Sequence, residues 1–219
     1  MAASKLITAS LHCLAWLPLP VLHGLGSGLG WCLSLTSARA KKIAATNIAL
    51  CWPELPAAQQ HRLVRSSLAE TGKTLLETGA LWLRPGKQVL GLIKQVSGHE
   101  LVEQAKLKGK GVILATPHLG AWEGAGLYCA KHFDISCLYR PPREPGMEQL
   151  ITSARSREGG QYIAANARGT RQLYKRLRQG KVVAMLPDQE PQAGAGLFAP
   201  FFGIPAYSMV LLARMATSY

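Results

Sequence analysis

Acidic residues are scarce in this chain. It has 12 Asp and Glu against 25 Lys and Arg, so its formal net charge is +13 at pH 7, and the first acid is Glu54. Charged residues make up only 17% of the chain, aromatic residues 7% and hydrophobic residues 48%. A nucleic-acid binder usually carries its Lys and Arg on a polar background with stacking aromatics, so we expect no nucleic-acid partner. Positive charge on an apolar background instead favours an anionic membrane surface and an acidic partner.

Closely spaced cysteines are also absent. The five cysteines, an odd number without any Cys-x-x-Cys pair, are Cys13, Cys32, Cys51, Cys129 and Cys137. This pattern predicts neither a disulfide framework nor a zinc site. We interpret them as small, buried, apolar side chains in a reducing cytosol.

Formal charge is missing from residue 6 to residue 36. A run of more than about 18 apolar residues is a candidate for crossing a membrane. Prolines and glycines interrupt this run, so a kinked span and two shallow half-helices are both compatible with it. Because basic residues follow the run at 39–42, we expect the rest of the chain in the cytoplasm. Residues 1–40 are thus predicted to be a membrane anchor and residues 41–219 a separate domain.

A cleavable signal peptide is the alternative interpretation of this segment. Ala38-Arg39-Ala40 resembles a small-x-small cleavage site. However, the apolar run is too long for a typical signal core, and the cleavage-like site lies within the basic flank. We therefore favour an anchor that is not cleaved.

The remaining sequence alternates between patterns typical of helices and of strands. Helices are expected over residues 57–83, 98–108, 121–132, 147–158, 170–179 and from Tyr207 to Ala216. Strands are expected over residues 89–96, 111–116, 135–139, 162–165 and 181–186, with a loop over 187–205. This alternation predicts an α/β fold in which helices flank a mostly parallel or mixed central sheet.

Three polar residues, His118, Arg140 and Asp188, each follow the end of an expected strand. In parallel sheets of this class, ligands bind beyond the carboxyl ends of the strands. The shared position therefore predicts that the three side chains line one cleft.

His118 and Glu123 have the residue types that are needed to take a proton from a hydroxyl. Imidazole titrates near neutrality, and a carboxylate bonded to its second nitrogen fixes the tautomer and stabilises the imidazolium. Positions five apart diverge by about 140° within one regular helix, so His118 must lie in the loop and Glu123 in the next helix. The alternative is an ordinary loop histidine near an acid favoured by the helix dipole. A metal site would need a third ligand, and none is evident nearby.

Several segments, taken in order, resemble the lysophospholipid acyltransferase superfamily and, within it, the lipid A late acyltransferases of lauroyl/myristoyl type. The segments are residues 42–54, residues 109–114, the pair His118 and Glu123, Tyr139-Arg140-Pro141, Leu186-Pro187-Asp188-Gln189-Glu190 and Ala199-Pro200-Phe201-Phe202-Gly203. The resemblance extends over almost the whole chain. The spacing of His118 and Glu123 alone is a weak signal, whereas the ordered set is specific.

The resemblance implies a glycerolipid acyltransferase-like α/β fold, with residues 41–219 as the acyltransferase domain. It implies transfer of an acyl chain from acyl-carrier protein to a hydroxyl of a lipid A precursor, without a metal or organic cofactor. It also implies the inner membrane as the location, with the catalytic domain on the cytoplasmic face. His118 is then the general base on the acceptor hydroxyl, and Glu123 orients its ring.

The same resemblance gives expected roles to Arg140, Arg155 and Asp188. The two arginines match characteristic family positions, and their planar forks suit the phosphates of the acceptor or the oxyanion that forms when a hydroxyl attacks a thioester. Asp188 is expected to position other groups and not to transfer a proton. The competing interpretations are surface charges for the arginines and a turn-shaping role for Asp188.

Members of this family usually continue past the equivalent of Tyr219 with at least another strand and helix. We therefore expect that the C-terminal part of the domain is missing from this sequence and that its last helix lacks cover. Two alternatives stay open. One is a glycerophospholipid acyltransferase of the same superfamily, although those typically carry Asp where this chain has Glu123. The other is an inactive, truncated, basic membrane-binding protein.

The helix expected over 170–179 is strongly basic on one side. Its basic residues within one arc are Arg171, Lys175 and Arg178. Leu173 and Leu177 lie roughly opposite. A solvated face is one interpretation of this pattern, and a docking surface for an acidic carrier protein or anionic headgroups is the other.

Overall fold

The computed structural model describes residues 2–36, 39–142 and 146–218. Its contacts divide the chain into two compact units. The first, which we call the sheet unit, comprises Met1–Thr8, Arg84–Leu197 and Ser208–Tyr219. The second, the helical unit, comprises Ala9–Leu83 and Phe198–Tyr207. Each unit is described by itself below.

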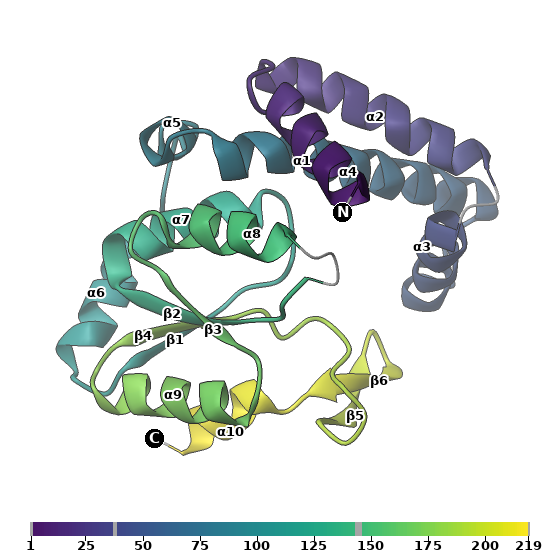
Figure 1. The fold of residues 1–219 in the computed structure, drawn as a ribbon. Helices are drawn as coiled ribbons and strands as arrows, with labels where there is room; N and C mark the ends of the chain where they lie inside the picture. The colour runs from purple at the N-terminus through teal and green to yellow at the C-terminus, as the bar shows by residue number, and fades with distance from the viewer. Residues whose placement is uncertain (1, 37–38, 143–145, 219) are drawn as a thin grey trace. The chain divides into compact units, whose positions relative to one another are not determined.

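The described part of the sheet unit is built on a four-stranded sheet (Figure 1). Its strands are β1 (Val112–Ala115), β2 (Ile135–Tyr139), β3 (Gln161–Ala164) and β4 (Val182–Met185). They lie in the order β1-β4-β2-β3, and every neighbouring pair is parallel. This confirms the predicted α/β class with a parallel central sheet.

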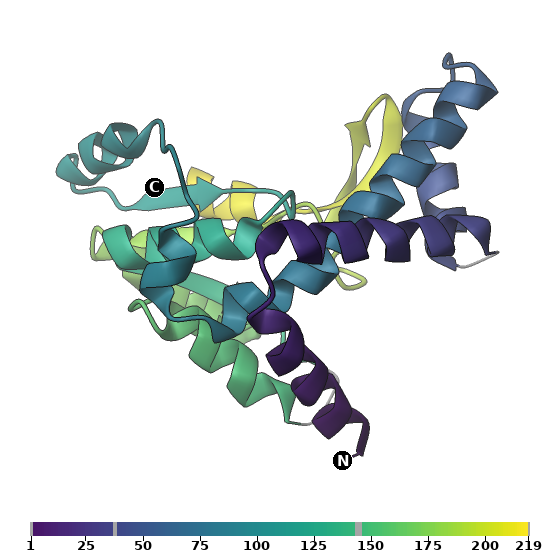
Figure 2. The ribbon, with the colours of Figure 1, turned by 90° about the horizontal axis from the view of Figure 1, so that it is seen from above.

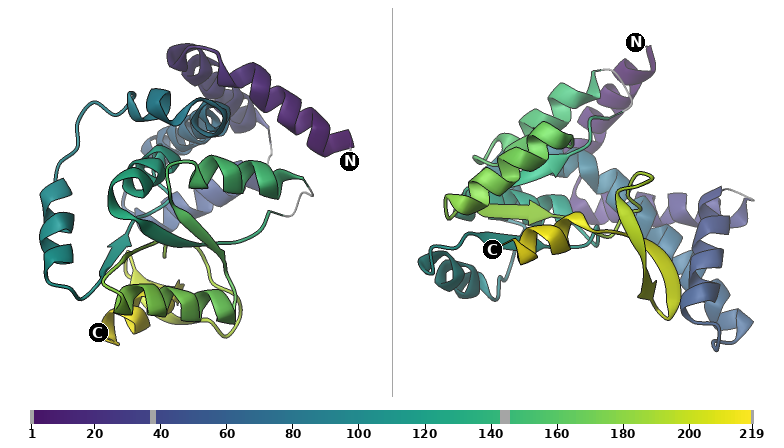
Figure 3. Two further views of the ribbon diagram at one scale, coloured as in Figure 1. Left: turned by 60° about the vertical axis from the view of Figure 1, so that its left-hand side comes forward. Right: turned by 90° about the horizontal axis from the view of Figure 1, so that it is seen from below.

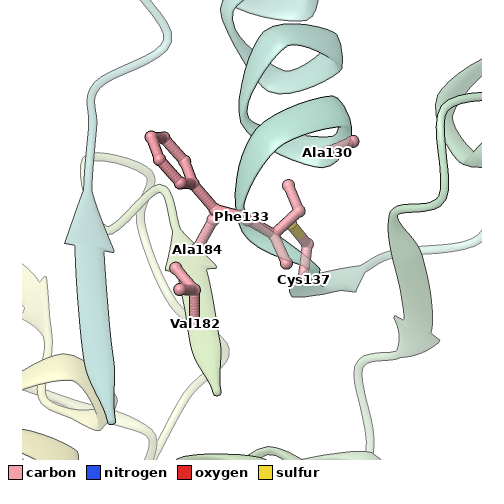
Figure 4. Packing of buried hydrophobic residues seen from close by; sticks show 6 residues of the cluster. Ala130, Phe133, Cys137, Val182 and Ala184 are labelled. Atoms are coloured by element: carbon pink, nitrogen blue, oxygen red, sulfur yellow. The ribbon is translucent and has the colours of Figure 1, made fainter. Parts of the chain in front are cut away.

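Strand β4 carries the core of this unit because both of its faces are buried. Side chains alternate between the two faces of a strand, so Val182 and Ala184 point to one side and Val183 and Met185 to the other. On the first side they pack with Ala130, Phe133 and Cys137 (Figure 4). On the second side Val183 and Met185 pack with residues such as Leu173, Leu177 and Met215. A continuous apolar strand is what a parallel sheet covered on both faces requires.

Helices cover the two faces of the sheet (Figure 1). The elements on one face are α7 (Trp122–Phe133) and α8 (Met147–Ser156), and Figure 2 looks down onto this layer. The elements on the other face are α9 (Ala167–Arg178) and α10 (Leu211–Thr217). Two further helices, α5 (Gly86–Leu90) and α6 (His99–Leu107), contact α7 and β1 respectively.

Three predicted segments were wrong in detail. The strand expected over 89–96 is absent, because its first residues belong to the short helix α5, which has Pro85 at its N-cap and buries Val89. Two paired strands, β5 (Gly196–Phe201) and β6 (Ile204–Met209), begin within the loop expected over 187–205 (Figure 3). Phe202 and Gly203 both have positive φ, as the two-residue turn of a tight hairpin requires. Since β6 continues to Met209, the last helix begins at Leu211 and not at Tyr207.

The helical unit is held together by close approach of α2 (Leu19–Leu35) and α4 (Ala57–Leu83), with α3 (Arg39–Cys51) packed on α4. Gly26 and Gly30 of α2 face Gly72 and its neighbours on α4 with no room for a side chain. A Cβ on Gly26 would lie 2.5 Å from the Cα atom of Lys73. Small residues are therefore required on this face of α2. The helix expected over 57–83 is confirmed as α4.

The uncharged N-terminal run lies in two helices of the described residues, α1 (Ala2–Ala15) and α2, and Pro18 occupies the N-cap position of the second. Of the helices in this described part of the chain, none has both the length and the apolar character needed to cross a membrane. The cleavage-like sequence includes Ala38, which lies outside the described residues. The membrane anchor and its boundary at residue 40 stay predictions.

We predict that Gly30→Ala lowers the free energy of unfolding by about 1–3 kcal/mol, the usual cost of overpacking. Its new methyl group would collide with the backbone of Leu68 and Ala69 on α4. Gly28→Ala is the matched control on the same helix, because a Cβ at Gly28 has no atom within 4 Å. Thermal unfolding followed by circular dichroism should show a lower Tm for Gly30→Ala and an equal or higher Tm for Gly28→Ala. Equal melting of both variants would contradict the close α2–α4 contact.

Candidate functional site

The sheet register brings His118 and Asp188 together. Strands β1 and β4 are adjacent and parallel, and their last residues, Ala115 and Met185, are direct partners. The pairing continues one residue further, where the Thr116 N–H donates to the carbonyl oxygen of Met185 at 3.1 Å. His118 and Asp188 each follow these partners by three residues, so they emerge side by side at the carboxyl edge of the sheet. This confirms that His118 lies in the loop after the strand, where the sequence placed it.

Asp188 binds His118 through both carboxylate oxygens. Its Oδ1 lies 2.8 Å from Nδ1 of the imidazole, and its Oδ2 accepts the His118 backbone N–H at 2.8 Å. An ionised carboxylate can only accept hydrogen bonds, so the neutral ring must carry its proton on Nδ1. Nε2 is then left with a lone pair, and it has no hydrogen-bond partner among the described residues. This is the arrangement that a general base needs.

The electrostatics of the pair favour an ionised Asp188. Partial burial alone would raise the pKa of this carboxyl, but the two hydrogen bonds from His118 outweigh burial and lower the pKa below its ordinary value. A carboxyl of depressed pKa stabilises the fold above its unfolded pKa, and this contribution is lost as the pH falls through the folded pKa. The His118 and Asp188 side chains keep 28% and 36% of their surface exposed, so a substrate can reach the ring.

Glu123 is bound by Arg155 and not by the His118 ring. From the second position of α7, its carboxylate accepts two hydrogen bonds from Nε of Arg155, at 3.1 and 3.2 Å, and one from Nη2 at 2.6 Å. The two side chains are only 11% and 19% exposed, and they join α7 to α8. Burial alone would lower the pKa of Arg155, but the hydrogen bond and charge of Glu123 raise it.

This contact corrects one geometric expectation of the sequence analysis. We expected the carboxylate of Glu123 to hold the ring of His118. Nδ1, however, carries a single proton, and Asp188 on the neighbouring strand β4 already accepts it. The catalytic roles of His118 and Glu123 stay predictions.

Trp122 links the His118–Asp188 hydrogen-bonded pair to the Glu123–Arg155 ion pair, and the sequence analysis gave it no role. Its ring meets the His118 ring edge to face, with the centroids 5.0 Å apart. The guanidinium carbon of Arg155 lies over the same indole, 5.2 Å from its centroid, and 5.9 Å from the ring of Tyr162. A cation on an aromatic face is attractive, so Arg155 restrains the ring that packs on His118. The sequence feature that could have pointed to Trp122 was an aromatic residue between His118 and Glu123 at the start of a helix.

The structure brings together four of the five predicted site residues, in the two pairs His118–Asp188 and Glu123–Arg155. The fifth, Arg140, follows β2 at the same carboxyl edge of the sheet. It is exposed and forms no hydrogen bond or ion pair with another described residue. A shared cleft for these side chains stays a prediction. Among the residues that the structure describes, no group of three His, Cys, Asp or Glu is placed to hold a metal ion.

We predict that His118→Ala raises the pKa of the Asp188 carboxyl toward the ordinary Asp value of about 3.9, because the ring's hydrogen bond and charge are lost. Carbon-13 NMR titration of the Asp carboxyl groups measures this directly. Asp134 is the internal control: its pKa is lowered, against its partial burial, by hydrogen bonds from Lys181 and Arg176, and it should not move. An Asp188 pKa that is the same in both proteins would contradict the pairing.

Comparison with known proteins shows which family the chain belongs to. Residues 2–219 match the model of the bacterial lipid A biosynthesis acyltransferase family. The Escherichia coli lipid A biosynthesis palmitoleoyltransferase is 29% identical over 188 residues, which cover 86% of this chain and 60% of that protein. The E. coli lauroyltransferase is 28% identical over 91% of this chain, and a Haemophilus influenzae lipid A biosynthesis acyltransferase is 28% identical over 93%. The chain spans 60–66% of the length of these relatives. It belongs to the bacterial lipid A biosynthesis acyltransferase family.

Proposed function

We propose that the protein transfers a fatty acyl chain from acyl-carrier protein to a hydroxyl of a lipid A precursor. The single observation that carries the chemistry is the His118–Asp188 pair, which leaves Nε2 of an aligned imidazole unbonded within the described residues. Family membership and the names of the relatives support lipid A over a glycerophospholipid as the acceptor. An inactive binding protein would have no need of an aligned imidazole.

In the proposed reaction, Nε2 of His118 takes the proton of the acceptor hydroxyl as its oxygen attacks the thioester carbonyl. The tetrahedral intermediate then collapses, the carbon–sulfur bond breaks, and the thiolate of the carrier takes the proton back from the imidazolium. Asp188 stays ionised throughout, fixing the ring and stabilising the imidazolium. It serves as a positioning residue, as its place beside Nδ1 supports.

The two arginines have different parts in this proposal. The charge of Arg155 is already neutralised by Glu123, so Arg155 is poorly suited to bind a phosphate of the acceptor. It instead positions Trp122 against His118. Arg140 is exposed at the same sheet edge, and its planar fork suits a phosphate of the lipid A precursor.

We further propose that the helical unit attaches to the cytoplasmic face of the inner membrane. The face of α2 toward α4 carries small residues, including Gly26 and Gly30, whereas large apolar side chains of the same helix point outward. The exposed ones are Val21, Leu25, Leu29, Trp31 and Leu35. Small residues inside and large apolar residues outside are typical of helices that contact lipid. The cations of α3 at 39–42 suit anionic headgroups.

We predict that His118→Ala lowers kcat by at least about 100-fold, since general base catalysis contributes about 10²–10⁴. Asp188→Asn should also lower kcat, because it removes the charge that stabilises the imidazolium. Acyl transfer from acyl-carrier protein to a lipid A precursor is measured by mass spectrometry of the product lipid. Circular dichroism and membrane flotation confirm that both variants are folded and bound. Unchanged turnover in the two variants would defeat the proposed mechanism.

Whether Glu123 acts through Arg155 is tested by a double-mutant cycle. We predict that Glu123→Ala lowers kcat in the wild-type background but has little further effect in an Arg155→Ala background. The reason is that the carboxylate touches the guanidinium and not the His118 ring. If the two losses of kcat multiply, Glu123 acts on the reaction independently of Arg155.

A further inference from the structure

Four cations form an exposed row along α9. They are Arg168, Arg171, Lys175 and Arg178, and all four side chains are exposed. At 100° per residue they fall within an arc of about 80°, and at 1.5 Å per residue the row is about 15 Å long. Leu173 and Leu177, on the opposite side of the helix, are buried against the sheet. The row therefore lies on the outer surface of the sheet unit.

The charge of this row is not compensated within the described residues. None of the four cations forms an ion pair there, and α9 itself contains no acid. The nearby Asp134 is already bound by Arg176 and Lys181. Like charges three and four positions apart repel each other, and Arg168 also opposes the helix dipole from the first turn. This repulsion lowers the stability of the free protein, and a bound polyanion would neutralise the charges and remove the repulsion.

The apolar residues of α9 indicate which kind of polyanion fits. A helix that lies in a membrane interface inserts large apolar side chains beside its cations. Leu173 and Leu177 are buried in the core, and no large apolar side chain is exposed on α9. The row can therefore contact a charged surface but cannot enter a bilayer. These features favour the surface of a folded acidic protein.

The direction of α9 relates the row to the candidate active site. Helix α9 follows β3 and precedes β4, and both strands run in the same direction. The N-terminal end of α9, with Arg168 and Arg171, is thus at the carboxyl edge of the sheet, where His118 and Asp188 lie. We propose that the row is the docking surface for the acidic carrier protein that delivers the acyl thioester. This proposal rests on the proposed function, which makes an acyl-carrier protein the donor.

The test uses the charge-reversal variant Arg171→Glu/Lys175→Glu. We predict that the KM for acyl-carrier protein rises at least about tenfold, while kcat at saturating donor changes less than about twofold, because neither residue touches the reacting groups. The dissociation constant for carrier without an acyl chain, measured by fluorescence anisotropy, should rise in parallel. Its dependence on NaCl concentration should become weaker. The charge-preserving variant Arg171→Lys/Lys175→Arg should behave as wild type.

Lys87→Glu is the matched control, since Lys87 is exposed on α5, which packs against α7 on the opposite face of the sheet. It should leave the carrier affinity unchanged. An unchanged carrier affinity in the double reversal would overturn the proposal. The proposal would also be overturned if the double reversal lost binding to phosphatidylglycerol vesicles and kept its carrier affinity, because the row would then bind lipid. Failure of the wild type to transfer any acyl chain would refute the proposed function, whereas carrier binding would still test the docking surface.

Discussion

The carboxylate of Asp188 fixes both the backbone and the ring of His118, and the geometry of the candidate site depends on this contact. The contact follows from the sheet. Parallel pairing of β1 with β4 sets Ala115 opposite Met185, and equal steps beyond these residues bring the two side chains together. The loops that follow β1 and β4 can therefore be short and still bring His118 and Asp188 together. Because one oxygen holds the amide and the other the imidazole, the ring cannot turn without breaking a charge-assisted hydrogen bond.

A more buried ion pair, Glu123–Arg155, supports this hydrogen-bonded pair. Glu123 and Arg155 join the first turn of α7 to α8, and the guanidinium lies on Trp122, whose edge meets the His118 ring. In the proposed function, the more exposed pair carries out the chemistry and the shielded pair holds Trp122 in place. This division explains how a histidine and a glutamate five residues apart can belong to one site without touching each other.

Much of the fold was predictable, because the sequence patterns are local. The apolar strand before His118 and the long helix 57–83 were placed from the pattern of apolar residues, and the helix that contains Glu123 from its spacing to His118. The order of the strands was not predictable, since it depends on pairing between distant segments. Without knowing that β4 lies beside β1, the sequence could not show that Asp188 and not Glu123 reaches Nδ1. The hairpin β5–β6 was missed because Phe202, a residue that rarely has positive φ, occupies its turn.

The protonation of the His118 ring is the most direct test of this account. Nitrogen-15 NMR of labelled protein, at a pH where the ring is neutral, distinguishes the protonated from the unprotonated ring nitrogen. The contact with ionised Asp188 predicts a proton on Nδ1 and a free lone pair on Nε2, the nitrogen that would take the hydroxyl proton. A neutral ring with its proton on Nε2 would contradict the alignment by Asp188 and, with it, the proposed role of His118 as the base.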